Sequence, residues 1–150
     1  MSLKLYKISA QETPIQITYV GGLRCGSLSP TAGMYLSKID LNEILKINKD
    51  ATFMAVAEGI SNDGFIQEGD RFFFDRGEDV HNGDMVICMV DQEATVKEYE
   101  LRDGIIHLKP MNKDFPEIII DPKNHNDVSI EGVVTLILRP CNERMRRRFR

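Results

Sequence analysis

The chain has 150 residues, of which 42% are hydrophobic and 28% are charged, a composition typical of one globular domain with a sizeable core. No apolar run approaches the ~20 residues needed to span a bilayer, and the N-terminal residues lack the apolar stretch of a secretory signal. We therefore expect a cytoplasmic protein without membrane attachment. The formal net charge of −4 excludes a surface built throughout for nucleic acid.

Residues with metal-binding chemistry are scattered along the chain. The three cysteines are an odd number without CxxC spacing, which argues against a disulfide framework and a zinc site. The three histidines have no ligand spacing either, and Asp70, Asp75 and Asp84 are better explained by turn chemistry than by a metal site. We therefore expect neither a metal nor another cofactor.

Residues 1–30 are predicted to form an extended N-terminal arm. They contain several glycines and prolines, and their one β-like piece covers residues 15–20. The small pair Cys25-Gly26 would fit a narrow active-site cleft, although a flexible linker explains the composition better. The arm is too short for a helix-turn-helix domain, so we expect no direct sequence-specific DNA binding.

A short helix is predicted after the arm. Asp40 is a suitable N-cap, and Glu43 stands three positions later, as in a capping box. The apolar side chains within residues 41–45 fall on one helical face, and polar residues from Asn48 onward end the pattern.

The remaining chain is predicted to be β-rich, with a domain that spans residues 31–140. Strand-like runs, separated by turn signals, cover residues 53–58, 71–75, 85–90, 94–101, 105–108, 117–120 and 128–138. Asp103-Gly104 is a type I′ hairpin signal, and the close spacing of the runs indicates a mainly antiparallel, partly closed sheet. Residues 141–150 are predicted to be a basic tail, which is usually solvated and less often contacts nucleic acid or a partner.

Ser61 is a candidate nucleophile. It follows the apolar run at residues 53–57 and begins a turn that continues through Asn62, Asp63 and Gly64. Such a turn can project a hydroxyl away from the core and point N–H groups at a developing oxyanion. Capping of the turn is the more common role for a serine in this context.

Lys97 is a candidate general base. It lies in the strand-like run of residues 93–101, where alternation places it in a more apolar row with Thr95 and Tyr99. Burial lowers a lysine pKa, and a neutral amine can take the proton of a serine hydroxyl, as in Ser-Lys catalysis. Because most strand lysines extend to water, the hypothesis requires Lys97 to be buried close to Ser61.

Several stretches together resemble the LexA/UmuD-like family of self-cleaving serine peptidases, over about residues 15–140. They look like the cleavage site with its following helix, the serine loop, the strand after a glycine–aspartate pair, the catalytic lysine strand and the closing segments. These stretches are residues 25–45, 57–70, 82–90, 93–101, 108–118 and 131–138. No single stretch is specific, but their combination at matching spacing is.

The resemblance implies an antiparallel β peptidase domain, with one short N-terminal helix, that cuts its own extended arm. Ser61 would be the nucleophile, Lys97 the general base and Cys25–Gly26 the scissile bond. It also implies a homodimer whose cleavage is stimulated by RecA filaments on single-stranded DNA in the SOS response to DNA damage. The trimmed dimer would be the accessory subunit of an error-prone Y-family translesion DNA polymerase, a UmuC-like partner.

The loop after Ser61 departs from the family pattern. Asn62 stands where the family has methionine, and Phe65-Ile66 replaces a glycine–isoleucine pair one residue early. Alignment from the downstream side would place Ile60 at the nucleophile position. A deletion within a turn is less disruptive than a shift of a core strand, which favours Ser61. An alternative prediction keeps the fold and the polymerase partner without catalysis, which leaves a binding module.

Overall fold

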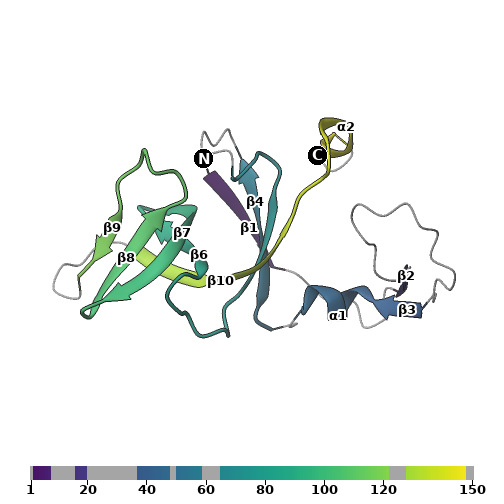
Figure 1. Cartoon of the computed structure of the whole chain (residues 1–150), viewed down its shortest axis with the longest axis horizontal. Coiled ribbons are helices and arrows are strands. Elements are labelled where there is room, and N and C mark those ends of the chain that lie inside the picture. The colour runs from purple at the N-terminus through teal and green to yellow at the C-terminus, as the bar shows by residue number, and fades with distance from the viewer. Residues whose placement is uncertain are drawn as a thin grey trace, which may run out of the picture. The chain divides into compact units, whose positions relative to one another are not determined.

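The computed structural model describes residues 2–7, 16–19, 37–47, 50–58, 65–121 and 128–147. The chain forms two compact units, one made of residues 1–8 and 50–150 and the other of residues 9–49. An eight-stranded sheet makes up the larger unit, and the smaller unit contains a two-stranded ribbon and a short helix (Figure 1).

The larger unit is an antiparallel sheet followed by one helical turn. Its elements are β1 (Ser2–Lys7), β4 (Thr52–Glu58), β5 (Arg71–Asp75), β6 (Met85–Val90), β7 (Glu93–Arg102), β8 (Ile105–Pro110), β9 (Ile118–Ile120), β10 (Val128–Leu138) and α2 (Glu143–Arg146). The strands lie in the order β1-β4-β5-β10-β6-β7-β8-β9, and all neighbours are antiparallel. The predicted mainly antiparallel β fold is therefore confirmed, and each predicted strand is present to within two residues.

The β7–β8 hairpin has the two-residue loop that the sequence predicts. Asp103 and Gly104 have φ values of 53° and 77°, and a type I′ turn requires positive φ at both central residues. Because Arg102 pairs with Ile105 across this turn, the register places Lys97 opposite Pro110.

The apolar core forms two clusters on opposite faces of β6 and β7, because successive side chains of a strand alternate between faces. The first cluster also receives residues from β1, β4 and β5. Its buried members are Leu3, Ala55, Ala57, Ile66, Phe72, Phe74, Ile87, Ala94 and Val96. The second cluster contains Val86, Cys88, Tyr99 and Leu108.

β10 joins the two halves of the sheet. Its first part pairs with β6 and its second part with β5, and its register shifts between Ile130 and Gly132 and again between Val134 and Leu136. Where β10 changes its pairing partner from β6 to β5, a Cβ on Gly132 would lie 2.5 Å from the carbonyl oxygen of Asp75. Glycine permits this close approach of two backbones, and a larger residue would push β10 away from β5.

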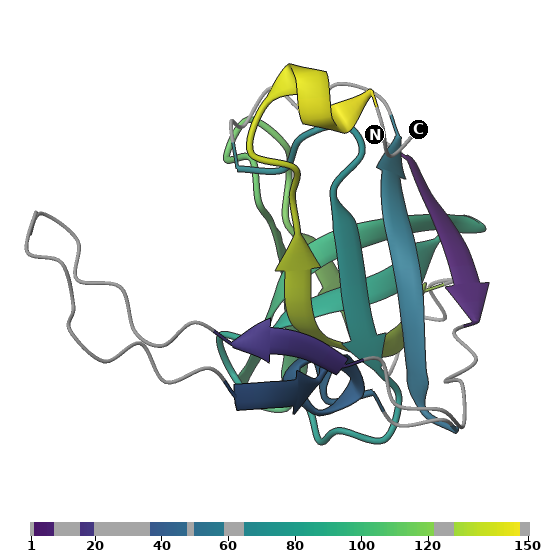
Figure 2. The same ribbon diagram turned by 90° about the vertical axis from the view of Figure 1, so that its right-hand side faces the viewer.

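β1 is a strand that the sequence analysis misses, because it lies within the residues predicted to be an extended arm. Its six residues pair with β4 along one edge of the sheet, from Ser2↔Glu58 to Lys7↔Phe53 (Figure 2). β1 also contacts β7, so the edge of the curled sheet returns towards the strand that carries Lys97. The division of the remaining chain into arm, domain and tail stays a prediction.

The smaller unit is a ribbon followed by a helix: β2 (Gln16–Tyr19), β3 (Ser37–Asp40) and α1 (Leu41–Leu45). β2 matches the predicted β-like piece and pairs antiparallel with β3. Asp40 caps α1 as predicted, since its carboxylate accepts a hydrogen bond from the Asn42 N–H at 2.9 Å. The helix ends earlier than predicted because Lys46 is left-handed, with a φ of 47°.

α2 lies within the residues predicted to be a basic tail. The Asn142 side chain accepts a hydrogen bond from the Met145 N–H at 3.0 Å, which is the usual interaction of an N-cap. In the part of the chain that the structure describes, no helix has the length and apolar character needed to cross a membrane.

Candidate active site

Lys97 lies near the middle of β7, between two neighbouring strands. It is directly opposite Val86 of β6 and Pro110 of β8. Its face of the sheet carries the second apolar cluster, in which Tyr99 is buried. Its side chain is half-buried, and Nζ donates a hydrogen bond to Thr95 Oγ1 at 3.2 Å. Lys97 therefore occupies the apolar row that strand alternation predicts.

The surroundings of Lys97 disfavour its charged form. Burial lowers the pKa of Lys97 below 10.5, and the neighbouring Cys88 opposes this shift to a smaller extent. Burial also raises the pKa of the Cys88 thiol to about 11, so at neutral pH the thiol has no charge with which to hold the ammonium. No described carboxylate forms an ion pair with Lys97. A lysine in this state is suited to act as a base.

The remaining predicted site residues, Ser61, Cys25 and Gly26, lie outside the described residues. The Ser61–Lys97 pair and the scissile bond therefore stay predictions. Cys25 and Gly26 belong to the segment of residues 20–36, which joins the paired strands β2 and β3.

The described residues fix both ends of the loop that contains Ser61. The Gly69 N–H donates a hydrogen bond to the Ala57 carbonyl at 2.8 Å, and the Ala57 N–H donates to the Asp70 carbonyl at 2.9 Å. The loop therefore leaves and re-enters the sheet at one pair of hydrogen bonds. Ile66, just after the loop, is 1% exposed and packs in the first apolar cluster, which fixes the returning chain.

An ion pair also fixes the chain where it returns from this loop to the sheet. Asp70 is 1% exposed, and its carboxylate accepts hydrogen bonds from Arg139 Nε at 2.8 Å and Arg139 Nη2 at 2.6 Å. It also accepts one from the Gln67 N–H at 2.8 Å, while Arg139 Nη2 donates to the Phe65 carbonyl. Arg139 thus ties the chain just after the predicted nucleophile to the end of β10. Sequence reasoning misses Arg139, because its partner lies 69 positions away and no local motif marks it.

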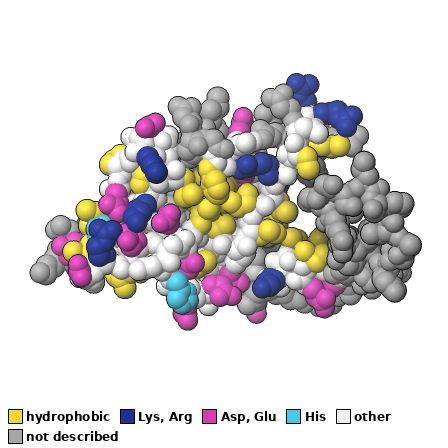
Figure 3. Space-filling model, in the orientation of Figure 1, with side chains coloured by type: hydrophobic (Ala, Val, Ile, Leu, Met, Phe, Trp, Pro, Cys, Tyr) yellow, Lys and Arg dark blue, Asp and Glu magenta, His cyan; other side chains and the backbone are white. Residues whose placement is uncertain are grey.

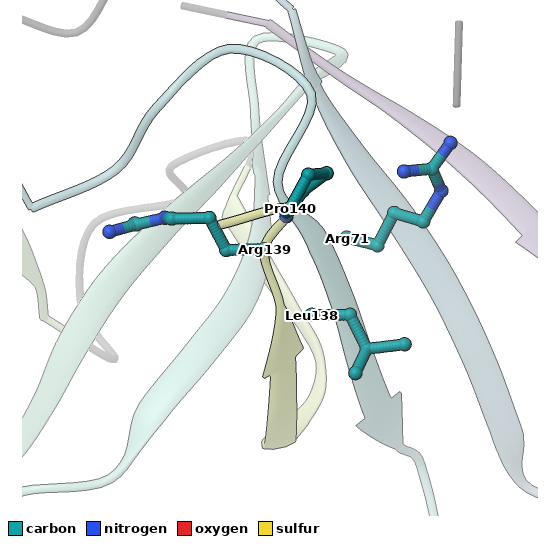
Figure 4. Close-up of a pocket in the computed structure, with 4 residues that line it drawn as sticks. All are labelled: Arg71, Leu138, Arg139 and Pro140. Atoms are coloured by element: carbon teal, nitrogen blue, oxygen red, sulfur yellow. The ribbon is translucent and has the colours of Figure 1, made fainter. Parts of the chain in front are cut away.

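An open pocket of about 210 Å³ lies beside this ion pair, lined by Arg71, Leu138, Arg139 and Pro140. Figure 4 shows the guanidinium groups of Arg71 and Arg139 extending in opposite directions, with Pro140 drawn between the two side chains and Leu138 below them in this view. The Arg139 guanidinium is bound to Asp70, and an arginine does not release a proton at accessible pH. The pocket therefore lacks a group suited to proton transfer.

The exposed parts of β7 and β8 carry charges of both signs. Glu100 Oε2 lies 2.5 Å from Arg102 Nη2 and 2.9 Å from Lys109 Nζ, and these cations lower the pKa of Glu100. Figure 3 shows basic and acidic side chains intermixed over these strands. This surface has neither the basic character expected for nucleic-acid binding nor the acidic character of a cation site.

Asp75 and Asp84 accept hydrogen bonds within turns, as predicted, whereas Asp70 also forms the ion pair with Arg139. Asp75 Oδ1 accepts a hydrogen bond from the Gly77 N–H at 2.7 Å, and Asp84 Oδ2 accepts one from the His81 N–H at 2.8 Å. Within the described ranges, no three His, Cys, Asp or Glu side chains are grouped so that they could hold a metal ion.

Comparison with known proteins agrees with this fold. The chain matches the Peptidase S24-like family over residues 18–135. It belongs to that family. The MucA proteins of Salmonella typhimurium and Escherichia coli are each 37% identical to it over 118 residues, which cover 78% of this chain and 80% of the relative. The LexA repressor of Photobacterium profundum is 33% identical over 93 residues, which cover 61% of this chain and 48% of the repressor. The predicted membership in the LexA/UmuD-like family is confirmed.

Proposed function

We propose that the chain is a self-cleaving serine peptidase that cuts its own N-terminal arm between Cys25 and Gly26. The observation that carries this proposal is the state of Lys97. Its side chain is half-buried, burial lowers its pKa, and it lies on the strand that resembles the lysine strand of the family. Such a lysine supplies a neutral amine at a lower pH than an exposed one.

In the proposed reaction, the neutral Lys97 amine takes the hydroxyl proton of Ser61 as the oxygen attacks the Cys25 carbonyl carbon. The bond to the Gly26 nitrogen breaks, the Lys97 ammonium protonates that nitrogen, and residues 1–25 remain as an ester on Ser61. The Lys97 amine then takes a proton from water, whose oxygen attacks the ester. The Ser61 oxygen leaves and regains a proton from the ammonium, which restores both side chains.

The β2–β3 ribbon is an argument for cleavage within the same chain. The pairing of Gln16 with Asp40 and of Tyr19 with Ser37 brings together the two ends of the segment that contains the scissile bond. A tethered substrate has a high effective concentration, so a self-cleaving peptidase needs no general substrate pocket. Cleavage then depends on how often the segment reaches the site, and a partner that favours the docked segment accelerates it by population shift.

We further propose that this partner is a RecA filament on single-stranded DNA and that the cut belongs to the SOS response in the cytoplasm. The trimmed chain would act as a homodimer and as the accessory subunit of a UmuC-like, Y-family translesion polymerase. The support is family membership together with the similarity to the two MucA proteins and the LexA repressor.

Mass spectrometry of the purified chain, incubated at several pH values up to about 10, tests the proposed activity. We expect fragments 1–25 and 26–150, at a rate that rises with pH as Lys97 loses its proton. Ser61→Ala should abolish the cut. Ser129→Ala is the matched control, because this exposed serine only donates a described hydrogen bond to Glu131, and the cut should persist.

A non-catalytic binding module of the same polymerase is the second candidate function. The observation that favours it is the loop after Ser61, which is one residue shorter than the family pattern and has Asn62 in place of methionine. The absence of cleavage both at pH 10 and with added RecA filaments would support this candidate and contradict the peptidase.

A further inference from the structure

The N-terminal fragment of the proposed cut contains two paired strands. β1 pairs with six residues of β4, and β2 pairs with four residues of β3. Both partner strands belong to residues 26–150. Hydrolysis of the bond between Cys25 and Gly26 would therefore leave two sets of backbone hydrogen bonds between the fragments.

β1 is attached by side chains as well as by its backbone. Leu3 is 8% exposed, stands opposite Ala57 and belongs to the first apolar cluster. Lys4 Nζ lies 2.6 Å from Glu58 Oε1. β1 also contacts β7, so it lies against a strand that is not its neighbour in the sheet.

Loss of β1 would have a clear physical cost. It would leave the edge of β4 with unpaired N–H and C=O groups and would expose apolar surface around Ala57. A single short strand binds weakly, but β1 and β2 lie on the same fragment. When one pairing opens, the other keeps the fragment nearby at a high effective concentration, and the opened pairing re-forms.

We propose that the product of self-cleavage is a nicked complex, in which residues 1–25 stay bound to residues 26–150 and β1 occupies the edge of β4. The position of the cut rests on the proposed function, and the retention of the fragment rests on the two strand pairings. The β4 edge is thus a binding surface whose occupant is this chain's own residues 2–7. Another strand can pair there only after it displaces them.

The test makes the cut independently of self-cleavage. In a full-length chain carrying Ser61→Ala, residues 23–28 are replaced by the recognition sequence of a site-specific protease. After complete cleavage, verified by denaturing mass spectrometry, the sample is run on native size-exclusion chromatography with intact-mass detection. We expect the two fragments to elute together. Elution of the short fragment alone would overturn the proposal and would leave the proposed peptidase activity untouched.

Two leucine substitutions test whether the packing of β1 retains the fragment. Leu3→Asp places a charge in the first cluster and should abolish co-elution, whereas Leu101→Asp changes a β7 leucine that is 47% exposed and should preserve it.

A peptide competition avoids any dependence on the folding of the Leu3→Asp chain. A labelled peptide of residues 1–25 is first exchanged into the nicked complex and then displaced by unlabelled peptides. The Leu3→Asp peptide should compete at least about tenfold less effectively than the unchanged peptide. Equal competition by the two peptides would show that β1 docking does not hold the fragment and would overturn the proposal.

Discussion

The region around Asp70 and the region around Lys97 hold ionisable side chains in opposite circumstances. Asp70 is the more buried, and its carboxylate accepts hydrogen bonds from Arg139 and Gln67. Lys97 is less buried, and among the described residues its ammonium donates only to the Thr95 hydroxyl. Strong partners stabilise the charged form of a buried group and the loop that it anchors, whereas burial with few partners shifts the pKa in favour of the neutral form. The contrast distinguishes a structural ion pair from a candidate base.

Lys97→Met is expected to have the largest effect, since it should abolish self-cleavage while it stabilises the fold. At pH 7, removal of a poorly solvated ammonium should raise the free energy of unfolding by about 1 kcal/mol, or about 2–4 °C in Tm. The pKa of Lys97 in the folded chain lies below its ordinary value of 10.5, which applies to the unfolded chain. At pH values between the folded and the unfolded pKa, the unfolded chain binds more protons, so the wild-type chain gains stability as the pH rises. The difference in Tm should therefore narrow towards pH 10.5.

Lys109→Met is the matched control for this comparison. Glu100 raises the pKa of Lys109, so the same replacement removes a favourable contact and should not raise Tm. Self-cleavage should continue in this variant. A lower Tm for Lys97→Met than for the wild-type chain at pH 7 would show that the Lys97 ammonium is well accommodated, which would contradict the assignment of a base.

Arg139→Ala tests the other side of the comparison. It leaves the Asp70 carboxylate buried without its cation, and we expect a loss of about 2–3 kcal/mol in the free energy of unfolding. This range is modest for a buried pair because the Arg139 side chain is 35% exposed. Urea unfolding at pH 7 measures it, with Arg102→Ala as the control, since that variant removes an exposed ion pair. Equal losses in the two variants would show that Asp70 does not depend on Arg139.

The features that the sequence predicts correctly are local. Alternation along residues 93–101 places Lys97 with Thr95, and the turn chemistry of Asp103-Gly104 sets the β7–β8 register. Both depend on neighbours within a few positions, so periodicity and backbone preference are sufficient to predict them.

The features that the sequence analysis misses depend on distant partners. β1 pairs with a strand about fifty residues later, and its alternation of Leu3, Lys4 and Leu5 is too short to separate from chance. Arg139 binds a carboxylate 69 positions away, and an arginine after the last strand has no local signature. The sequence therefore indicates the candidate base, while the ion pair that fixes the serine loop emerges only from the fold.

Thr95→Val tests the hydrogen bond that the Lys97 ammonium donates to the Thr95 hydroxyl. The Thr95 hydroxyl is the described acceptor for the Lys97 ammonium, so its removal should favour the neutral amine and lower the pKa of Lys97 further. The midpoint of the cleavage rate against pH should then move to lower pH. Thr135→Val is the control, because the Thr135 hydroxyl donates to the Phe73 carbonyl and should leave the midpoint in place. A shift to higher pH would contradict the role of Thr95 as an acceptor.

Cys88→Ala is expected to have the smallest effect on the titration of Lys97. Burial holds the pKa of the thiol at about 11, so at the pH values where Lys97 loses its proton the sulfur is still uncharged. Burial is the larger cause of the lowered pKa of Lys97, and Cys88 opposes it only to a smaller extent. The cleavage rate should therefore keep its pH midpoint or move it only slightly to lower pH in this variant. A fall larger than that produced by Thr95→Val would reveal a thiolate that pairs with the Lys97 ammonium, as Asp70 pairs with Arg139.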